Sequence, residues 1–141
     1  MDKNLEKIEH FIAQHHVLTL ATSVDDFMSA CSLFYAYDDA SRSFIVASSE
    51  DTLHSEQIKK NPVIAGNILL ETKEVGKIQG LQFRGVFETL TDAELKSLYF
   101  KTFPYALALR PTLWQIKVDY FKLTDNRLGF GKKLIWQVPS L

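Results

Sequence analysis

The sequence lacks several features on which common protein classes depend. A single cysteine, Cys31, excludes an intrachain disulfide, which is typical of a protein kept in a reducing compartment. The 16 basic and 17 acidic side chains nearly cancel, so the chain has no basic excess of the kind that non-specific nucleic-acid binding needs. No apolar run approaches the ~20 residues that span a bilayer, and the first residues alternate charged with apolar side chains instead of forming a signal core. We expect a cytoplasmic protein with neither a nucleic-acid nor a membrane partner.

Motifs that identify a reaction are also missing. The glycines form neither a GxGxxG pattern after a strand nor a GxxxxGK[ST] phosphate loop. His10 is not spaced four residues from His15 or His16, as a helical metal pair would be, so no metal site is expected. No Ser or Cys nucleophile motif occurs. Catalytic residues therefore cannot be identified from motifs.

The composition that is present favours one β-rich domain. A chain of 141 residues, 46% of them hydrophobic, is long enough for one core, and we expect residues 1–141 to form a single domain. Ten Phe and five Tyr side chains favour strands and suit a site that stacks a planar ring.

Periodicity and turn residues predict a small antiparallel barrel. Helices are expected at residues 3–15, 52–60 and 92–103, the last of them begun by a Thr91-x-x-Glu94 capping box. Strands are expected at residues 17–22, 28–37, 43–48, 63–70, 78–90 and 113–123, and residues 128–138 close the chain. Because strands follow one another with few helical crossovers, we expect a mainly β (α+β) fold, a six-stranded antiparallel barrel with flanking helices.

The stretch in which the third strand passes into the second helix is the most informative. Hydroxyl side chains and the unpaired amides of a helix start are a common phosphate-binding combination. The polar side chains concerned are Ser48, Ser49, Thr52 and His54, and either His54 or Lys59 could supply a cation. The alternative is simple capping of the helix by Asp51 or Thr52, and the acidic Glu50 and Asp51 would repel a phosphate.

Two further stretches have ligand-binding character. Gln82 and Arg84 lie on the polar side of the long strand, where they either hydrogen-bond the edge of a ring or face solvent. Glycines flank Phe130, and Trp136 follows shortly after, so these rings either stack on a ligand or serve a hairpin and the core.

Residues 43–68, SFIVASSEDTLHSEQIKKNPVIAGNI, resemble the phosphate-contacting segment of the pyridoxamine-phosphate-oxidase-like, FMN-binding split-barrel superfamily. The resemblance covers nearly the whole chain. The later stretches GLQFRGVFETL and TDN-x-LGFGKK-x-IW are similar to a small bacterial branch of that superfamily without an assigned reaction. The Arg and His pattern with which true pyridoxamine phosphate oxidases bind substrate at the C-terminus is absent.

The resemblance implies a homodimer that holds two FMN molecules at its interface. In the matched pattern Ser48 is the strand-end hydroxyl, Thr52 is the helix-start hydroxyl, His54 takes a Lys position, and Leu53 replaces an Arg. The second strand would lie along the flavin ring, Gln82 would bind its pyrimidine edge or ribityl chain, and the Phe130–Trp136 segment would come from the partner. The implied cofactor-binding residues are Ser32, Leu33, Phe34, Tyr35, Ser48, Ser49, Thr52, His54, Gln82, Phe130, Lys132 and Trp136.

Two functions follow from these observations. The first is an FMN-dependent oxidoreductase acting on an unknown small-molecule substrate, in which the flavin supplies the chemistry and no catalytic side chain stands out. The second is a non-enzymatic module that binds haem or another planar ligand, which is suggested by Leu53 at the Arg position.

Overall fold

The computed structural model describes residues 2–139. Its helices are α1 (Lys3–Ala13), α2 (Leu53–Lys60) and α3 (Ala93–Thr102), with short 3-10 turns η1 (Val75–Lys77), η2 (Pro104–Leu109) and η3 (Asn126–Leu128). Its strands are β1 (Val17–Val24), β2 (Phe27–Asp38), β3 (Ser43–Ala47), β4 (Val63–Leu70), β5 (Gln79–Thr89), β6 (Leu113–Asp125) and β7 (Lys133–Gln137). No helix within residues 2–139 has the length and apolar character needed to cross a membrane.

The strands form one antiparallel sheet that closes on itself. Their order is β3-β2-β1-β4-β5-β6-β7, and an additional β3–β6 pairing joins the first six strands into a ring. Strand β6 pairs with a different strand along each part of its length: residues 113–117 pair with β3, and residues 120–124 pair with β7. The mainly β fold with flanking helices is confirmed. The expected strand count was one too low, because residues 128–138 contain a separate five-residue strand, β7, after a 3-10 turn.

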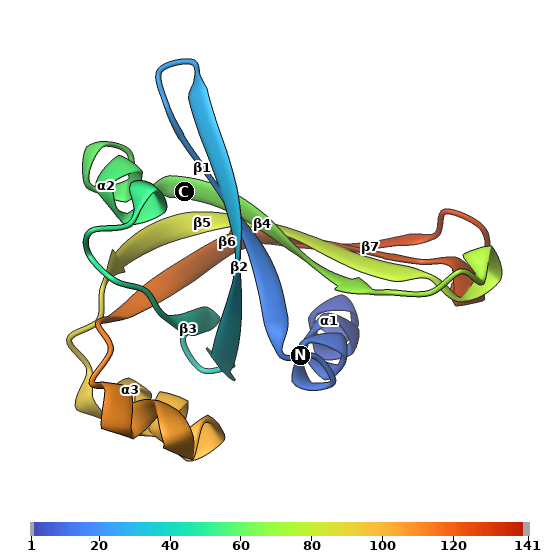
Figure 1. Ribbon diagram of the computed structural model, residues 1–141. Helices are drawn as coiled ribbons and strands as arrows, with labels where there is room; N and C mark the ends of the chain where they lie inside the picture. The colour runs from blue at the N-terminus through green and yellow to red at the C-terminus, as the bar shows by residue number, and fades with distance from the viewer. Residues whose placement is uncertain (1, 140–141) are drawn as a thin grey trace.

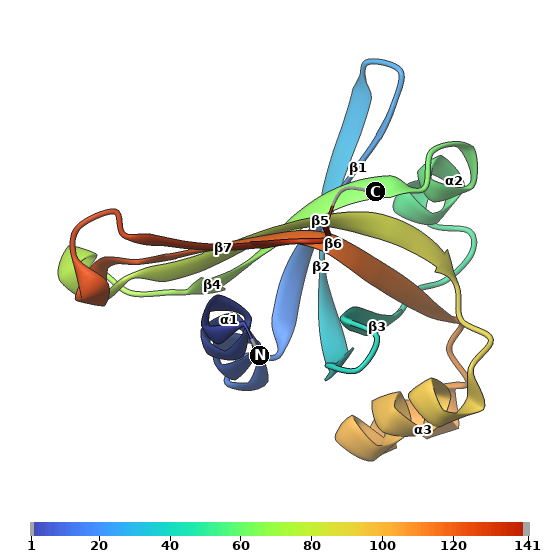
Figure 2. The same ribbon diagram turned by 180° about the vertical axis from the view of Figure 1, so that it is seen from behind.

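Two groups of strands extend beyond the ring. The β1–β2 hairpin projects on one side, and the ends of β4, β5, β6 and β7 form a long arm on another (Figures 1 and 2). At the end of the arm the Asn126 side chain donates to the Val75 carbonyl at 2.8 Å and so joins η3 to η1. Helix α1 lies beside β1 and the arm, where the Asn4 side chain donates to the Ile135 carbonyl at 3.3 Å.

Alternating side chains fill the inside of the ring. Leu20, Phe83 and Phe121 point inward and are almost fully buried, while their strand neighbours point outward. The apolar side of α1 adds Ile8 and Phe11, which burial removes from water. Each fully buried side chain of this size contributes about 1.5–3 kcal/mol, so this interior supplies most of the stabilisation of the barrel.

A bulge bends β5 against β6 where the ring closes. The register between these strands shifts between Arg84 and Gly85. At Gly85 an added Cβ atom would overlap the main-chain carbonyl oxygen of Lys117, so the two backbones approach more closely there than any other residue type allows. The glycine is thus required by the curvature of the barrel.

The helix boundaries follow their caps. Thr52 caps α2, with its hydroxyl accepting from the Ser55 amide at 3.3 Å, and α2 begins one residue later than expected. The capping-box prediction for α3 was wrong: Asp92, not Thr91, is the N-cap and accepts from the amides of Glu94 and Leu95. A carboxylate one residue closer to the helix reaches both amides at once, so the Thr91 hydroxyl is not needed.

Candidate functional site

The turn from β3 into α2 gathers four polar side chains, Ser48, Thr52, His54 and Ser55, which we call the hydroxyl corner. Strand β3 ends here, and the backbone is fixed from both sides, since the Trp114 indole donates to the Ser48 carbonyl at 2.9 Å and the Ser48 amide donates to Thr112 at 3.0 Å. Ser48 and Ser55 are buried, whereas Thr52 and His54 are partly exposed. The structure brings Ser48, Thr52 and His54 together, and their contact with a phosphate stays a prediction.

The side chains of the hydroxyl corner bond mainly to one another. The Ser48 hydroxyl contacts Nε2 of His54, and Thr52 Oγ1 lies 3.2 Å from the same nitrogen. Thr52 Oγ1 is 2.8 Å from the Ser55 hydroxyl, which donates to the Ser49 carbonyl at 2.8 Å. A bound anion would therefore have to rearrange an existing network of side-chain hydrogen bonds.

The electrostatics of the hydroxyl corner do not favour an anion strongly. Burial lowers the pKa of His54, so its imidazole is neutral at neutral pH and supplies no positive charge. The exposed Ser49 hydroxyl donates to Asp51, and Leu53 is half-exposed where a cation was expected by resemblance. The corner can offer hydrogen bonds to a phosphate, but it offers little charge.

The neutral state of His54 has a measurable consequence. Because its pKa is lower in the folded protein, the unfolded chain binds the extra proton more readily, and the free energy of unfolding falls as pH drops below about 6.5. We expect a His54→Gln variant to show a smaller loss of stability between pH 7 and pH 5 than the parent, as measured by urea unfolding. His15, whose pKa burial also lowers, leaves part of the decline in place.

A His10→Gln variant, in which an exposed imidazole is removed from α1, is the control for loss of an imidazole outside the hydroxyl corner. Equal slopes for the parent and His54→Gln would contradict a buried neutral imidazole at this position.

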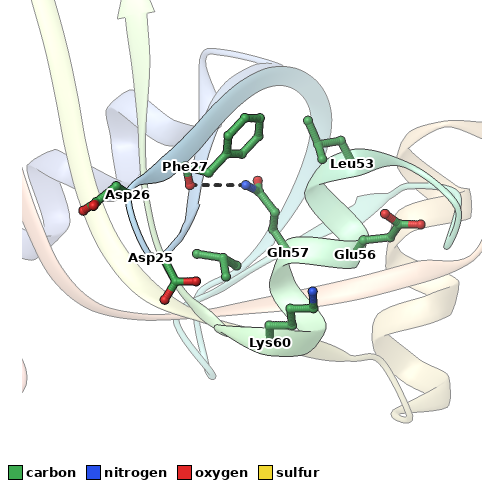
Figure 3. A pocket seen from close by; sticks show the side chains of 8 residues that line it. Asp25, Asp26, Phe27, Leu53, Glu56, Gln57 and Lys60 are labelled. Carbon is green, nitrogen blue, oxygen red and sulfur yellow. Dashed lines mark hydrogen bonds between the residues drawn. The ribbon is translucent and has the colours of Figure 1, made fainter.

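A pocket of about 600 Å³ adjoins the hydroxyl corner between α2 and the tip of the β1–β2 hairpin (Figure 3). The Gln57 side chain is fixed there, since its carbonyl oxygen accepts from Thr22 at 2.6 Å and from Ser29 at 2.7 Å, and its nitrogen donates to the Phe27 carbonyl at 3.3 Å. Asp25, Asp26 and Glu56 outnumber the single Lys60 around this pocket. It is therefore poorly suited to a phosphate.

The outer surface of the sheet carries two rows of aligned residues across five strands. The first row is polar and contains Ser32, Thr19, Asn67, Gln82 and Lys122, each opposite the next in the strand register. The second row contains Ala30, Ala21, Ala65, Arg84 and Tyr120. The rows lie side by side, so a flat floor of alanine borders a line of amide and hydroxyl groups. We call this arrangement the outer platform.

Part of the outer platform is hollowed into a groove of about 530 Å³. Ala21, Ala65 and Gly66 form its floor, and the exposed Gln82 lines one side. The Arg84 guanidinium lies over the Tyr120 ring, 4.4 Å from its centre, so a cation is held at the edge of the groove. The groove can accept a planar ring on its floor and bind the edge of that ring through amide and guanidinium groups.

The predicted residues of β2 divide between the two faces of the strand. Ser32 and Phe34 point outward with the platform and are exposed. Leu33 is half-buried, and Tyr35 lies in the core with its hydroxyl donating to the Ile12 carbonyl at 2.6 Å. Only the outward pair faces the platform, as the two-residue period of a strand requires.

The predicted residues of the C-terminal segment also separate. Phe130 and Lys132 lie exposed in the turn at the end of the arm. Trp136 is buried on β7, packed against Phe121 with the Arg42 guanidinium over its ring. Of the two aromatic rings, Phe130 is the one exposed for contact with a ligand or partner, and a flavin contact by any of the three remains a prediction.

Several residues of the outer platform were not singled out from the sequence, namely Thr19, Ala21, Ala65 and Asn67. The sequence does carry small or polar residues at alternate positions of β1 and β4. That pattern indicates a shared surface only once the strand register, which pairs these residues across the two strands, is known. Among residues 2–139 no group of three or more His, Cys, Asp or Glu side chains is arranged to hold a metal ion.

A closed six-stranded ring with protruding hairpins and an outer groove defines a split-barrel protein. It superposes on a haem-binding protein from Mycobacterium smegmatis with a TM-score of 0.80 and 15% identity, over 97% of this chain and 59% of that one. It also superposes on a FAD-binding protein from Mesorhizobium loti (TM-score 0.72, 15% identity, 84% and 90% covered) and on a NimC/NimA family protein from Clostridium acetobutylicum (0.70, 13%, 95% and 93%).

Relatives in sequence then define the family. The chain is 33% identical over 138 residues to a UPF0306 protein of Photorhabdus laumondii, with 96% of each chain covered. A UPF0306 protein of Yersinia pseudotuberculosis is 37% identical over 132 residues, with 92% of this chain and 90% of that one covered. This chain belongs to the UPF0306 family. No protein-family model matches the sequence.

Proposed function

We propose that this split barrel is a pyridoxamine-phosphate-oxidase-like flavoprotein that binds FMN as a homodimer, with the flavin ring on the outer platform. The observation that carries the proposal is the groove with an alanine floor between Asn67, Gln82 and Arg84. A flavin ring is planar and apolar on its faces but carries donors and acceptors on its pyrimidine edge. The floor suits the faces, and the two amides suit the edge. Split-barrel relatives described as FAD-binding and haem-binding support a planar ligand.

Exposed apolar side chains surround the outer platform. Val17, Phe34, Val63, Leu69 and Val86 all point outward around it, with exposed fractions between 37% and 60%. Contiguous exposed apolar surface of this kind usually marks an interface. A second copy placed against this face would bury these side chains and close the groove over the ring, which excludes water from the site.

We place the flavin ring and its phosphate on different subunits of the dimer. Gln82 lies seven residues along β5 from Thr89, which pairs with Trp114 beside the hydroxyl corner. At ~3.3 Å per residue this path along the strand is roughly 20 Å long. The ring would lie in the groove of one subunit, and the phosphate would lie at the hydroxyl corner of the other.

FMN would supply hydride or electron transfer, while the chain provides binding and electrostatics. Gln82 and Asn67 would orient the ring through its pyrimidine edge. Arg84, held over Tyr120, would place a positive charge beside that edge, where reduction of a flavin increases negative charge. With this arrangement the protein is an oxidoreductase of a small-molecule substrate and needs no nucleophile of its own.

The direct test is FMN binding by the purified full-length protein and by Gln82→Leu. We expect yellow protein or micromolar uptake of added FMN, and an approximately tenfold higher Kd for Gln82→Leu, because one hydrogen bond contributes about 1 kcal/mol or slightly more. Gln14→Leu, at an exposed glutamine that follows α1 and does not line the groove, is the matched control and should bind like the parent. Colourless protein that takes up no FMN would refute FMN binding. Equal FMN affinity of the parent and Gln82→Leu would refute the placement of the flavin ring in the groove.

Haem binding is the second candidate, favoured by the lack of charge at the hydroxyl corner. A neutral His54 and the half-exposed Leu53 offer no positive charge to a phosphate, so a phosphate would bind weakly there. A porphyrin needs no phosphate site. Thermal melting with FMN and with haemin distinguishes the two, because only a true ligand raises Tm with its concentration. A shift with haemin alone would replace the flavin proposal with this one.

A further inference from the structure

The outward face of β2 ends in two exposed patches, one at each end of the strand. Met28, Ala30, Ser32 and Phe34 alternate along this face, and all four are exposed. Met28 lies next to the β1–β2 turn, whereas the centre of the Phe34 ring lies 5.5 Å from that of Phe103, at the start of η2. The hairpin and the α3–η2 segment lie at opposite ends of the molecule (Figures 1 and 2). At ~3.3 Å per residue, Met28 and Phe34 are roughly 20 Å apart.

The patch at the hairpin end is acidic and apolar. It consists of Asp25, Asp26 and Met28, and we call it the hairpin patch. Both carboxylates are exposed, and neither forms a salt bridge within residues 2–139. Lys60 of α2 lines the adjoining pocket together with the acidic Glu56, so the surroundings add no net positive charge. Since Met28 is also 76% exposed, this patch suits a partner surface that is basic and apolar.

The patch at the other end has the opposite charge. It consists of Lys101, Tyr105, Leu107, Leu109 and Arg110, all of them exposed, and we call it the η2 patch. Tyr105 is 94% exposed and Leu109 is 80% exposed. Residues 95–118 contain four basic side chains and no acidic one, so this segment offers no carboxylate to Lys101 or Arg110. Exposed apolar surface with a charged border is typical of an interaction site.

We propose that the η2 patch of one copy of this chain docks on the hairpin patch of a second copy, and the reverse, in a two-fold dimer. The patches lie at opposite ends of one face, so an axis that crosses the middle of β2 forms both contacts at once. An axis along β2 would instead oppose the carboxylates of two hairpins and the cations of two η2 patches, which like charges disfavour. Charge therefore selects the crosswise arrangement. This contact rests on the dimer proposed above but does not require FMN.

The two patches extend the interface that the outer platform would form. A stable interface buries about 800 Å² on each partner, and one aromatic side chain such as Tyr105 can bury roughly 150–250 Å². In a two-fold dimer each chain buries its own hairpin patch and its own η2 patch. Ala30, Ser32 and Phe34 join the two patches along β2, so the buried surface would be continuous.

Cross-linking of the purified full-length protein tests the orientation. Met28→Cys, Ala108→Cys and the variant with both changes are compared in a Cys31→Ala background, which removes the single native thiol. Ala108 is an exposed small residue of η2, so these changes keep every charge of both patches. With a bismaleimide shorter than the separation of the patches in one chain, we expect covalent dimers on a denaturing gel for the double variant and few for either single variant.

Efficient cross-linking of Met28→Cys alone would overturn the crosswise arrangement, because it would place hairpin against hairpin. Absence of covalent dimers in the double variant would overturn the contact between the two patches.

Charge reversal provides a second test, read as the dimer Kd from analytical ultracentrifugation. Asp26→Lys and Lys101→Glu each oppose like charges twice in the dimer, so we expect each to raise the Kd at least about tenfold. Their combination exchanges the two signs and should bring the Kd back toward that of the parent. Glu6→Lys makes the same charge change at an exposed position of α1 and is the control that should dimerise like the parent. A combined variant that dimerises no better than the single variants would overturn the pairing of the patches.

The parent protein distinguishes failure of this contact from failure of the proposed function. A parent that stays monomeric with and without FMN would refute the dimer and this contact together. A parent that dimerises and binds FMN, but shows neither the cross-link nor the charge rescue, would refute only this contact.

Discussion

Gly85→Ala is expected to destabilise the protein by about 3 kcal/mol or more and to lower Tm by about 10 °C. The added Cβ would overlap the Lys117 carbonyl oxygen and lie 3.0 Å from its carbonyl carbon. These are backbone atoms of β6, so no side-chain rotation can relieve the overlap. The two strands would have to separate where the bulge closes the ring. Thermal melting and urea unfolding of the purified variant measure the effect.

Gly80→Ala is the matched control in the same strand. Its nearest neighbour would be the end of the Leu69 side chain at 3.8 Å, which is ordinary van der Waals contact. We expect a change of stability within about 1 kcal/mol, with a gain possible because alanine restricts the unfolded chain. Similar losses at both glycines would show that the close approach of β5 to Lys117 does not determine the curvature.

Local patterns predicted the elements of this fold well because each depends on nearby residues. The alternation in β5 and the Thr52 cap of α2 are both properties of short stretches. Two local predictions were wrong for physical reasons. Asp92 competes with Thr91 for the same amides, and the glycines around Phe130 form a turn that separates β7 from η3. The β3–β6 pairing that closes the ring joins distant segments and left no local pattern.

The candidate site was only partly predictable for the same reason. The hydroxyl corner lies within eight residues of one turn, so the sequence brought its members together. The outer platform is assembled from five strands, and only the register places Thr19 opposite Asn67 and Asn67 opposite Gln82. Composition also could not show that Tyr35 and Trp136 would be core residues, since aromatic side chains suit both a core and a stacking site.

The two faces of β5 and β6 thus have different roles. Inward side chains build the core, and outward side chains build the outer platform. A substitution on the outward face should therefore change ligand binding without much effect on folding. Ala65 is the most informative such position, because it lies exposed in the centre of the groove floor, opposite Ala21 and Arg84.

Ala65→Trp is expected to reduce FMN affinity by at least about a hundredfold, because an indole ring would occupy the floor on which the flavin ring is placed and remove several kcal/mol of ring burial. The position is exposed, so the free energy of unfolding of the monomer should change by less than about 1 kcal/mol. Fluorescence titration with FMN and sedimentation velocity measure affinity and assembly together.

Lys133→Trp places the same ring on an exposed site of β7, well along the arm, and is the control that should bind FMN normally.

A double variant of the hydroxyl corner gives a further comparison. Thr52→Ala combined with His54→Ala should weaken FMN binding by about tenfold, because it removes two side chains proposed to contact the phosphate of the FMN held in the partner's groove. Because the same face forms the proposed subunit contact, Ala65→Trp should also shift the dimer toward monomer. FMN binding that survives Ala65→Trp but is lost in the corner variant would move the ring away from the outer platform while keeping the phosphate site.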